Sequence, residues 1–159
     1  MESEANENLE RLKESASSWL GEPAAVGNGA LIETAFLMAA ADGELSDIER
    51  EQLIATIEYI SNRQTPREQL DETIDQLIAA LEADGWEERI RAVASSLEDP
   101  IARRNAYRLA AGISFIDGEV QEEEARLFSL LAAAFEIPSE EAERILVEVR
   151  DELFPPVAE

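Results

Sequence analysis

The chain of 159 residues contains no cysteine and no histidine. Without thiolates, the sequence excludes disulfides, iron–sulfur clusters, zinc–cysteine sites and cysteine nucleophiles. Without imidazole, it also excludes Ser-His-Asp triads, haem with a histidine ligand and most transition-metal sites. The side chains left for chemistry are carboxylates and hydroxyls, so the sequence favours binding of a hard cation or contact with a protein partner.

Positive charge is scarce as well. Basic residues number 13 against 36 acidic ones, which gives a formal net charge of −23, and Lys13 is the one lysine. Nucleic acids need basic groups to displace their counterions, and anionic membrane surfaces recruit clusters of lysine and arginine. We therefore expect an unidentified protein partner, and neither nucleic acid nor a membrane surface.

Long apolar runs are missing too. The longest strictly apolar stretch, Ala35 to Ala41, is far shorter than the ~18 residues of a membrane-spanning helix. The first residues, Met1 to Asn8, are acidic and polar and lack the basic and apolar regions of a signal peptide. These features predict a cytoplasmic protein without membrane insertion.

Helical periodicity runs through every long segment, and none alternates with period two over the length of a strand. Apolar stripes, prolines and capping residues predict helices over residues 9–20, 30–41, 46–60, 65–84, 86–97, 99–116, 121–135 and 138–154. The fold class predicted is all-α, a compact bundle of about seven to eight helices joined by short loops.

The length predicts a single globular domain. Within it we assign residues 1–28 to an N-terminal helix and linker and residues 29–159 to the helical domain proper, because Gly21-Glu22-Pro23 interrupts the first helix. We expect the helical domain to fold without the first 20 residues.

An internal repeat is the most informative feature. The pattern Asp-Gly-Glu-hydrophobe-x-x-x-Glu occurs at Asp42 to Glu49 and again at Asp117 to Glu124. The flanking apolar positions also correspond, for example Met38 with Ile113. The repeat predicts two related helix–loop–helix units packed about a pseudo-twofold axis.

Helix-corner chemistry explains part of this motif. The glycines suit helix C-termini, and Glu49 can close a capping box with Ser46. Asp42 and Asp117 remain unexplained, because a negative charge at a helix C-terminus opposes the helix dipole. Glu124 remains unexplained as well, because the N-cap before it is a glutamine, which breaks the box there.

A hard-cation site explains the remainder. If the two corners meet, four carboxylates converge and two more lie close by: Asp42, Glu49, Asp117 and Glu124, with Glu44 and Glu119. A site of oxygen atoms alone suits Ca²⁺ or Mg²⁺ rather than Zn²⁺. The spacing is not that of an EF-hand, and a di-iron bundle would need Glu-x-x-His ligands. A divalent cation is the expected cofactor.

The doubled corner, each copy following a helix rich in alanine and isoleucine, resembles the TerB family, which is linked to tellurite resistance. It is also similar to the N-terminal module of a membrane-anchored DnaJ-like co-chaperone, and the resemblance covers about residues 29–153. It implies a compact helical bundle whose acidic site, carried over by position, falls on Asp42, Glu49, Asp117 and Glu124. It implies a stress-associated scaffold or sensor without an established reaction.

Three functional hypotheses follow. The first is a non-catalytic module that binds a divalent cation and docks a protein partner. The second is a purely structural interaction protein without metal, in which Trp19 and Trp86 mark a partner groove. The third is a hydrolase that uses two carboxylates or a metal ion, which the sequence disfavours because no nucleophile or oxyanion hole is evident.

Overall fold

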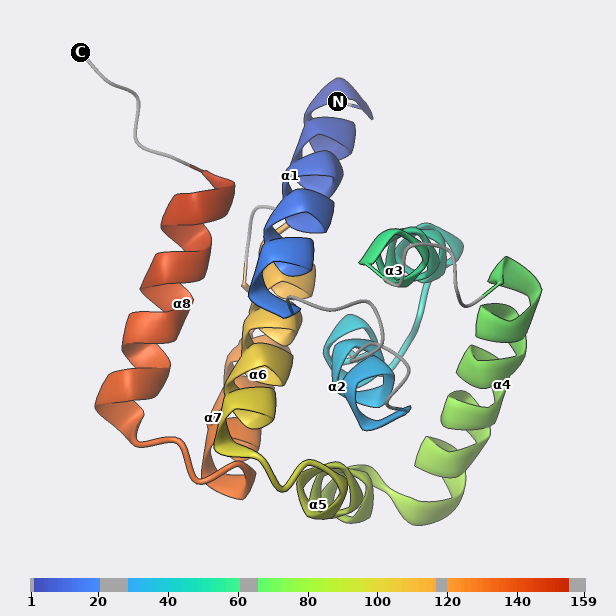
Figure 1. The fold of residues 1–159 in the computed structure, drawn as a ribbon. Helices are drawn as coiled ribbons and strands as arrows, with labels where there is room; N and C mark the ends of the chain where they lie inside the picture. The colour runs from blue at the N-terminus through green and yellow to red at the C-terminus, as the bar shows by residue number, and fades with distance from the viewer. Residues whose placement is uncertain (1, 21–28, 61–65, 117–119, 155–159) are drawn as a thin grey trace.

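The computed structural model describes residues 2–20, 29–60, 66–116 and 120–154. Over these residues the chain forms eight α-helices and no strand: α1 (Glu2–Leu20), α2 (Gly29–Ala39), α3 (Asp47–Ile60), α4 (Arg67–Asp84), α5 (Trp86–Ser96), α6 (Pro100–Phe115), α7 (Glu122–Ala134) and α8 (Ser139–Leu153). The predicted all-α class is confirmed. Figure 1 shows α6 between α8 and α2, with α4 at the edge farthest from α8.

Local signals set most helix ends where the sequence placed them. Before α6, the side chain of Asp99 accepts a hydrogen bond from the backbone N–H of Ile101 at 2.9 Å, and Pro100 occupies the first turn. Between α4 and α5, Gly85 adopts a φ of 86°, a left-handed conformation that favours glycine. The exception is α1, which begins at Glu2 rather than near residue 9, because the acidic residues ahead of the apolar stripe also favour a first helical turn.

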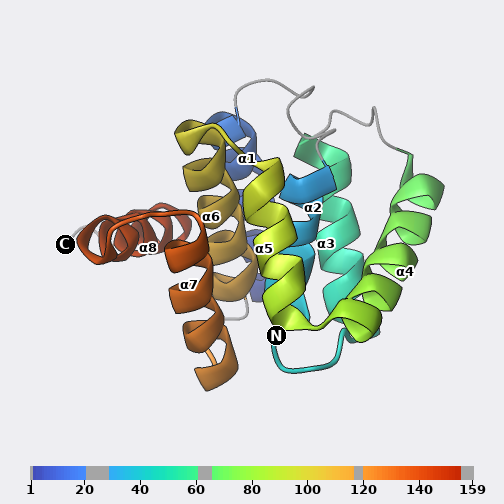
Figure 2. The ribbon, with the colours of Figure 1, turned by 90° about the horizontal axis from the view of Figure 1, so that it is seen from below.

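Helix α2 forms the centre of the bundle. Every residue after Gly29 in this helix is buried. It packs against α3, α4, α5 and α6, which surround it in Figures 1 and 2. A helix that is apolar on nearly all sides must be enclosed in this way to keep its side chains out of water. The prediction of a buried helix over this segment is therefore confirmed.

Helix α6 forms the second centre. It packs against α2 on one side and against α1, α7 and α8 on the others. The two helices that lead the predicted repeats, α2 and α6, thus lie against each other in the core. A pseudo-twofold relation between the two hairpins remains a prediction, and the second corner, residues 117–119, lies outside the described residues.

Helix α1 shares this core through a close contact with α6. Leu12 is fully buried, and a Cβ atom placed on Gly112 would lie 2.3 Å from the Leu12 Cδ1 atom. The absence of a side chain on Gly112 therefore lets α1 approach α6. Two polar contacts also fasten α1: Asn8 Nδ2 donates to the Ile116 carbonyl at 3.2 Å, and Trp19 Nε1 donates to Glu152 Oε2 at 2.9 Å. These are the contacts that a truncation of the first 20 residues would remove, and folding of the remaining helices without them stays a prediction.

A buried ion pair holds α2 against α5. Glu33 is 6% exposed, and its two carboxylate oxygens accept hydrogen bonds from Arg89 Nε and Nη2, each at 2.7 Å. Arg89 Nη1 also donates to Asp84 Oδ2 at 2.9 Å, at the end of α4. The bond to Glu33, and after it the bond to Asp84, raises the pKa of the Arg89 guanidinium above its ordinary value. The Arg89 guanidinium therefore stays charged, and its contacts with Glu33 and Asp84 join three helices.

Arg89→Met leaves the Glu33 carboxylate buried without its partner, so we predict a loss of about 3–5 kcal/mol in the free energy of unfolding. Adding Glu33→Leu removes the unpaired charge and should recover much of the loss. Urea unfolding of the single and double variants measures both. The matched control is Arg91→Met, on the exposed face of the same helix, with a change within about 0.5 kcal/mol. Strictly additive losses would contradict a coupled pair.

Leu12→Ala removes a fully buried side chain from the contact between α1 and α6, and we predict a cost of about 2–5 kcal/mol. Gly112→Ala in the same background should recover part of it, because the new methyl group fills the space that Leu12 vacates. Urea unfolding measures the coupling. A cost for Leu12→Ala below about 0.5 kcal/mol would show that α1 is peripheral to an independent domain over residues 29–159.

Candidate functional site

Three of the six predicted carboxylates line one cleft of about 380 Å³. They are Asp42, Glu49 and Glu124, and a fourth carboxylate that the repeat motif does not include, Glu123, lines the cleft with them. The cleft lies where the turn after α2, the first turn of α3 and the first turn of α7 come together. Glu44 is exposed and does not line it, and Asp117 and Glu119 lie outside the described residues.

Asp42 occupies the turn that ends α2. Its Oδ1 atom accepts a hydrogen bond from the backbone N–H of Glu44 at 3.0 Å. The turn is completed by Gly43, whose φ is 96° and whose N–H donates to the Ala40 carbonyl at 2.9 Å. An aspartate that bonds to the backbone two residues ahead stabilises a turn of this kind. The sequence analysis found no local reason for Asp42, and this bond supplies one.

Glu49 closes the predicted capping box at the start of α3. Its Oε1 atom accepts from the Ser46 backbone N–H at 2.9 Å, and the Ser46 hydroxyl accepts from the Glu49 N–H at 3.1 Å. The box fixes the carboxylate of Glu49 at the cleft and leaves Oε2 without a hydrogen bond among the described residues. The prediction of a capping box here is confirmed.

Glu124 is held by both of its oxygens. Oε1 accepts from the backbone N–H of Gln121 at 2.8 Å, and Oε2 accepts from the hydroxyl of Ser114 at 2.8 Å. The first bond is the acidic half of a capping box, so the expectation that Gln121 breaks the box is wrong for that half. Ser114 is fully buried on α6, and the sequence analysis missed it. The sequence feature that could have identified Ser114 is a lone hydroxyl within the otherwise apolar end of that helix.

A smaller pocket connects two of these carboxylates. Glu49 and Glu124 both line a space of about 10 Å³ whose remaining walls include Leu53, Ile113 and Ile116. That volume corresponds to roughly one water-sized probe. The two carboxylates therefore face a common polar opening in a mainly apolar wall, at the end of the bundle where α2 and α6 terminate.

No basic side chain neutralises the cleft in the part of the chain that the structure describes. The ion pairs found there involve none of Asp42, Glu49 and Glu124. Across residues 2–20, 29–60, 66–116 and 120–154, no three acidic side chains lie close enough together to hold a metal ion. The oxygen-only donor set suits Ca²⁺ or Mg²⁺. A complete coordination shell would therefore require ligands beyond these three, and the predicted ones are Asp117 and Glu119.

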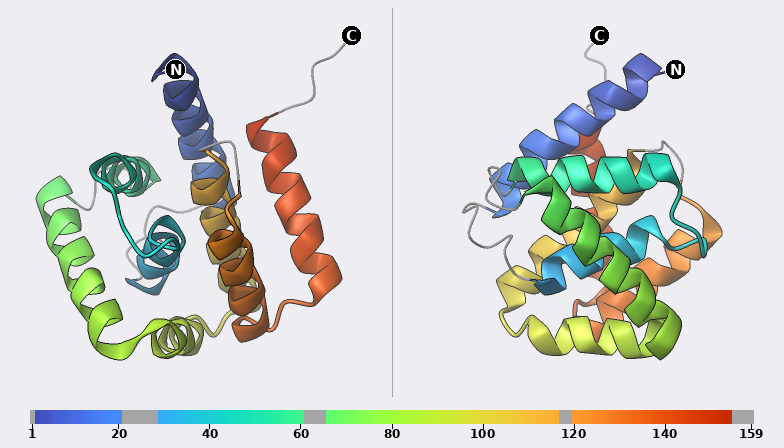
Figure 3. Two further views of the ribbon diagram at one scale, coloured as in Figure 1. Left: turned by 180° about the vertical axis from the view of Figure 1, so that it is seen from behind. Right: turned by 90° about the vertical axis from the view of Figure 1, so that its right-hand side faces the viewer.

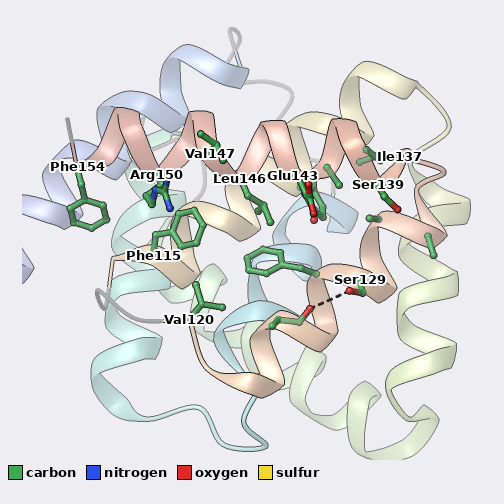
Figure 4. Close-up of a pocket in the computed structure, with 16 residues that line it drawn as sticks. Phe115, Val120, Ser129, Ile137, Ser139, Glu143, Leu146, Val147, Arg150 and Phe154 are labelled. Carbon is green, nitrogen blue, oxygen red and sulfur yellow. Dashed lines mark hydrogen bonds between the residues drawn. The ribbon is translucent and has the colours of Figure 1, made fainter. Parts of the chain in front are cut away.

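A second and larger opening was not anticipated. A groove of about 820 Å³ separates α7 from α8, with Phe115 and Phe128 among its lining (Figure 4). Neither Trp19 nor Trp86 lines it, and both tryptophans pack partly buried against the core. The hypothesis that these tryptophans mark a partner groove does not describe this opening.

In the described part of the chain, no helix combines the length and the apolar character needed to cross a membrane. This observation agrees with the expectation of no membrane insertion.

The comparisons with known proteins agree with the resemblance drawn from the repeat. The sequence model of a family described as tellurite resistance protein TerB matches residues 28–147. No curated protein and no solved structure matches the chain significantly. The matched region spans most of the chain, from the start of α2 into α8, and contains both acidic corners. The chain therefore belongs to the TerB family.

Proposed function

We propose that this protein is a non-catalytic TerB module that binds a divalent cation at the acidic cleft and docks a protein partner. The observation that carries the cation half is the position of Asp42, Glu49 and Glu124 around one cleft without a basic neighbour in the described residues. The docking half rests on the large groove between α7 and α8.

Electrostatics supports a cation at the cleft. The protein has a formal net charge of −23, and its field adds to the local repulsion among the four carboxylates that line the cleft. A divalent ion would offset that repulsion and draw the corner after α2 towards the start of α7. The candidate ligands are the three predicted carboxylates that line the cleft and Glu123 beside them, together with Asp117, Glu119 and Glu44. Because every candidate donor is an oxygen atom, we propose Ca²⁺ or Mg²⁺ rather than Zn²⁺.

A structural role without metal is the second candidate. The hydrogen bonds made by Asp42, Glu49 and Glu124 favour it, because each carboxylate stabilises a turn or a helix start in its own right. The cleft does not favour the hydrolase hypothesis, since its described lining contains carboxylates and one amide but no hydroxyl nucleophile and no basic group.

Thermal unfolding with and without calcium or magnesium tests the cation site. At a ligand concentration a hundred times the dissociation constant, binding adds ~2.7 kcal/mol to the free energy of unfolding. For a chain of this length we predict a rise of about 5–10 °C in Tm. Ionic strength must be matched with monovalent salt, because screening alone also weakens the repulsion. An unchanged Tm with calcium, magnesium and manganese at millimolar excess would contradict the proposal.

The variant Asp42→Asn with Glu124→Gln separates the two candidates. Asp42→Asn keeps the oxygen that accepts from the Glu44 N–H, and Glu124→Gln keeps one oxygen that accepts from the Gln121 N–H. The Ser114 hydroxyl, which donates to the second oxygen of Glu124, can instead accept from the new amide group. Both replacements remove a negative charge. We predict that the metal-free variant is more stable than the wild type and has lost the response to cations. The control is Glu122→Gln, in the first turn of α7 but outside the lining, which keeps the response. An equal cation response in the double variant and the wild type would show that the ion binds elsewhere.

A further inference from the structure

The groove between α7 and α8 has the form of a docking site. The two helices diverge from the turn near Ile137 and Ser139, and Figure 4 shows the space between them widening towards Phe154 and Val120. Helix α6 packs against both and forms the floor. Val120 and Val147 lie at the edges of the groove and are 44% and 46% exposed. An occupant of the groove would remove this apolar surface from water.

The wall on α7 consists of Phe128 and four small side chains. Ala125, Ser129, Ala132 and Ala133 line it, at a spacing that places them on one face of the helix. The facing wall on α8 includes Leu146 and Val147 together with charged side chains. Small residues on one wall let the backbone of another helix approach closely.

The floor offers a hydrogen-bond donor without a partner. Tyr107 is 1% exposed and lines the groove, and its hydroxyl makes no hydrogen bond to another described residue. Every fully enclosed side-chain nitrogen or oxygen in the described part of the chain has a partner, so this hydroxyl opens onto the groove. Burial raises the pKa of Tyr107 to about 12, and the hydroxyl therefore keeps its proton at neutral pH.

Two charges lie along the α8 wall. Glu143 lines the groove and forms no ion pair within the described residues. Arg150, two helical turns further on, is exposed and lies 3.9 Å from Asp151. A molecule bound in the groove would therefore lie near the unpaired carboxylate of Glu143, towards the narrow end, and near the guanidinium of Arg150, towards the wide end.

We propose that this groove docks a cationic amphipathic helix of a partner protein, an inference that rests on the docking half of the proposed function. The net charge of −23 opposes a second copy of this chain and opposes an anionic amphiphile, and it attracts a basic segment. An amphipathic helix lays its apolar face into such a groove. In this arrangement a basic residue of the partner helix pairs with Glu143. A polar acceptor on the buried face of that helix accepts a hydrogen bond from the Tyr107 hydroxyl.

The probe is a synthetic helical peptide of about 18 residues with leucine at helical spacing on one face and lysine on the other. Fluorescence anisotropy of the labelled peptide measures its affinity. We predict binding about tenfold tighter than that of a peptide of the same composition in scrambled order, and no binding of the version with glutamate in place of lysine. Equal affinity for the scrambled peptide would overturn the proposal, since charge alone would then account for binding.

Paired variants locate the site. Ala133→Trp fills the groove, whereas Leu130→Trp places the same side chain on α7 outside its lining. Glu143→Lys and Glu148→Lys change the net charge equally, but Glu143 alone of the two lines the groove. We predict that Ala133→Trp and Glu143→Lys each weaken binding about fivefold or more and that both controls stay within about twofold. Equal effects within either pair would overturn the proposal. Circular dichroism checks the fold of each variant.

The same experiment distinguishes other occupants. Binding of oleate, lost in Ala133→Trp, together with no peptide binding would assign the groove to an anionic amphiphile and overturn the proposal. Self-association of the protein in sedimentation velocity, lost in the same variant, would assign it to a second copy. The peptide is titrated without divalent cations. If the peptide does not bind, the proposal of docking in the groove is contradicted. If the Tm does not respond to cations, the proposal of a cation site at the acidic cleft is contradicted.

Discussion

The ion pair between Glu33 and Arg89 is the constraint on which the arrangement of the bundle depends. Helix α2 is enclosed by four neighbours, and Glu33 is its one charged residue. A buried carboxylate is tolerated when its partner is placed with good geometry, and here Arg89 meets both oxygens while it also reaches the end of α4. This contact fixes α2 relative to α5. The position of α2 in turn determines where its C-terminal turn, with Asp42, lies at the end of the bundle.

Helix α6 positions the other side of the cleft in a comparable way. Gly112 admits α1 on one face, and Ser114, two residues later, holds the carboxylate of Glu124 at the start of α7. The two central helices therefore terminate at the same acidic cleft, and local hydrogen bonds hold its carboxylates in place. The groove between α7 and α8 shares no lining residue with the acidic cleft. The proposed cation site and the proposed docking groove are therefore separate surfaces, and residues of α7 line both.

The sequence predicted those features that depend on local periodicity and capping. It predicted the helices and the box at Ser46 and Glu49, because apolar spacing and end signals act within a few residues. The resemblance carried by the doubled acidic corner indicated the family. It did not predict the bond from Ser114 to Glu124 or the pair of Glu33 and Arg89, since these depend on how distant helices are packed. The groove was missed for the same reason. The apolar spacing along α7 would be the same if Phe128 were wholly internal, although it contacts α6 and also lines the groove.

Paramagnetic broadening of amide resonances by substoichiometric Mn²⁺ tests the central claim most directly, because it locates an ion without any substitution. The proposal of a single cation site at the cleft predicts that amides of residues 42–49 and 121–124 broaden first and that calcium or magnesium reverses the effect. Helices α4 and α8 are also rich in acidic residues and serve as internal references. Broadening spread evenly over those helices, with no preference for the cleft, would contradict the proposal.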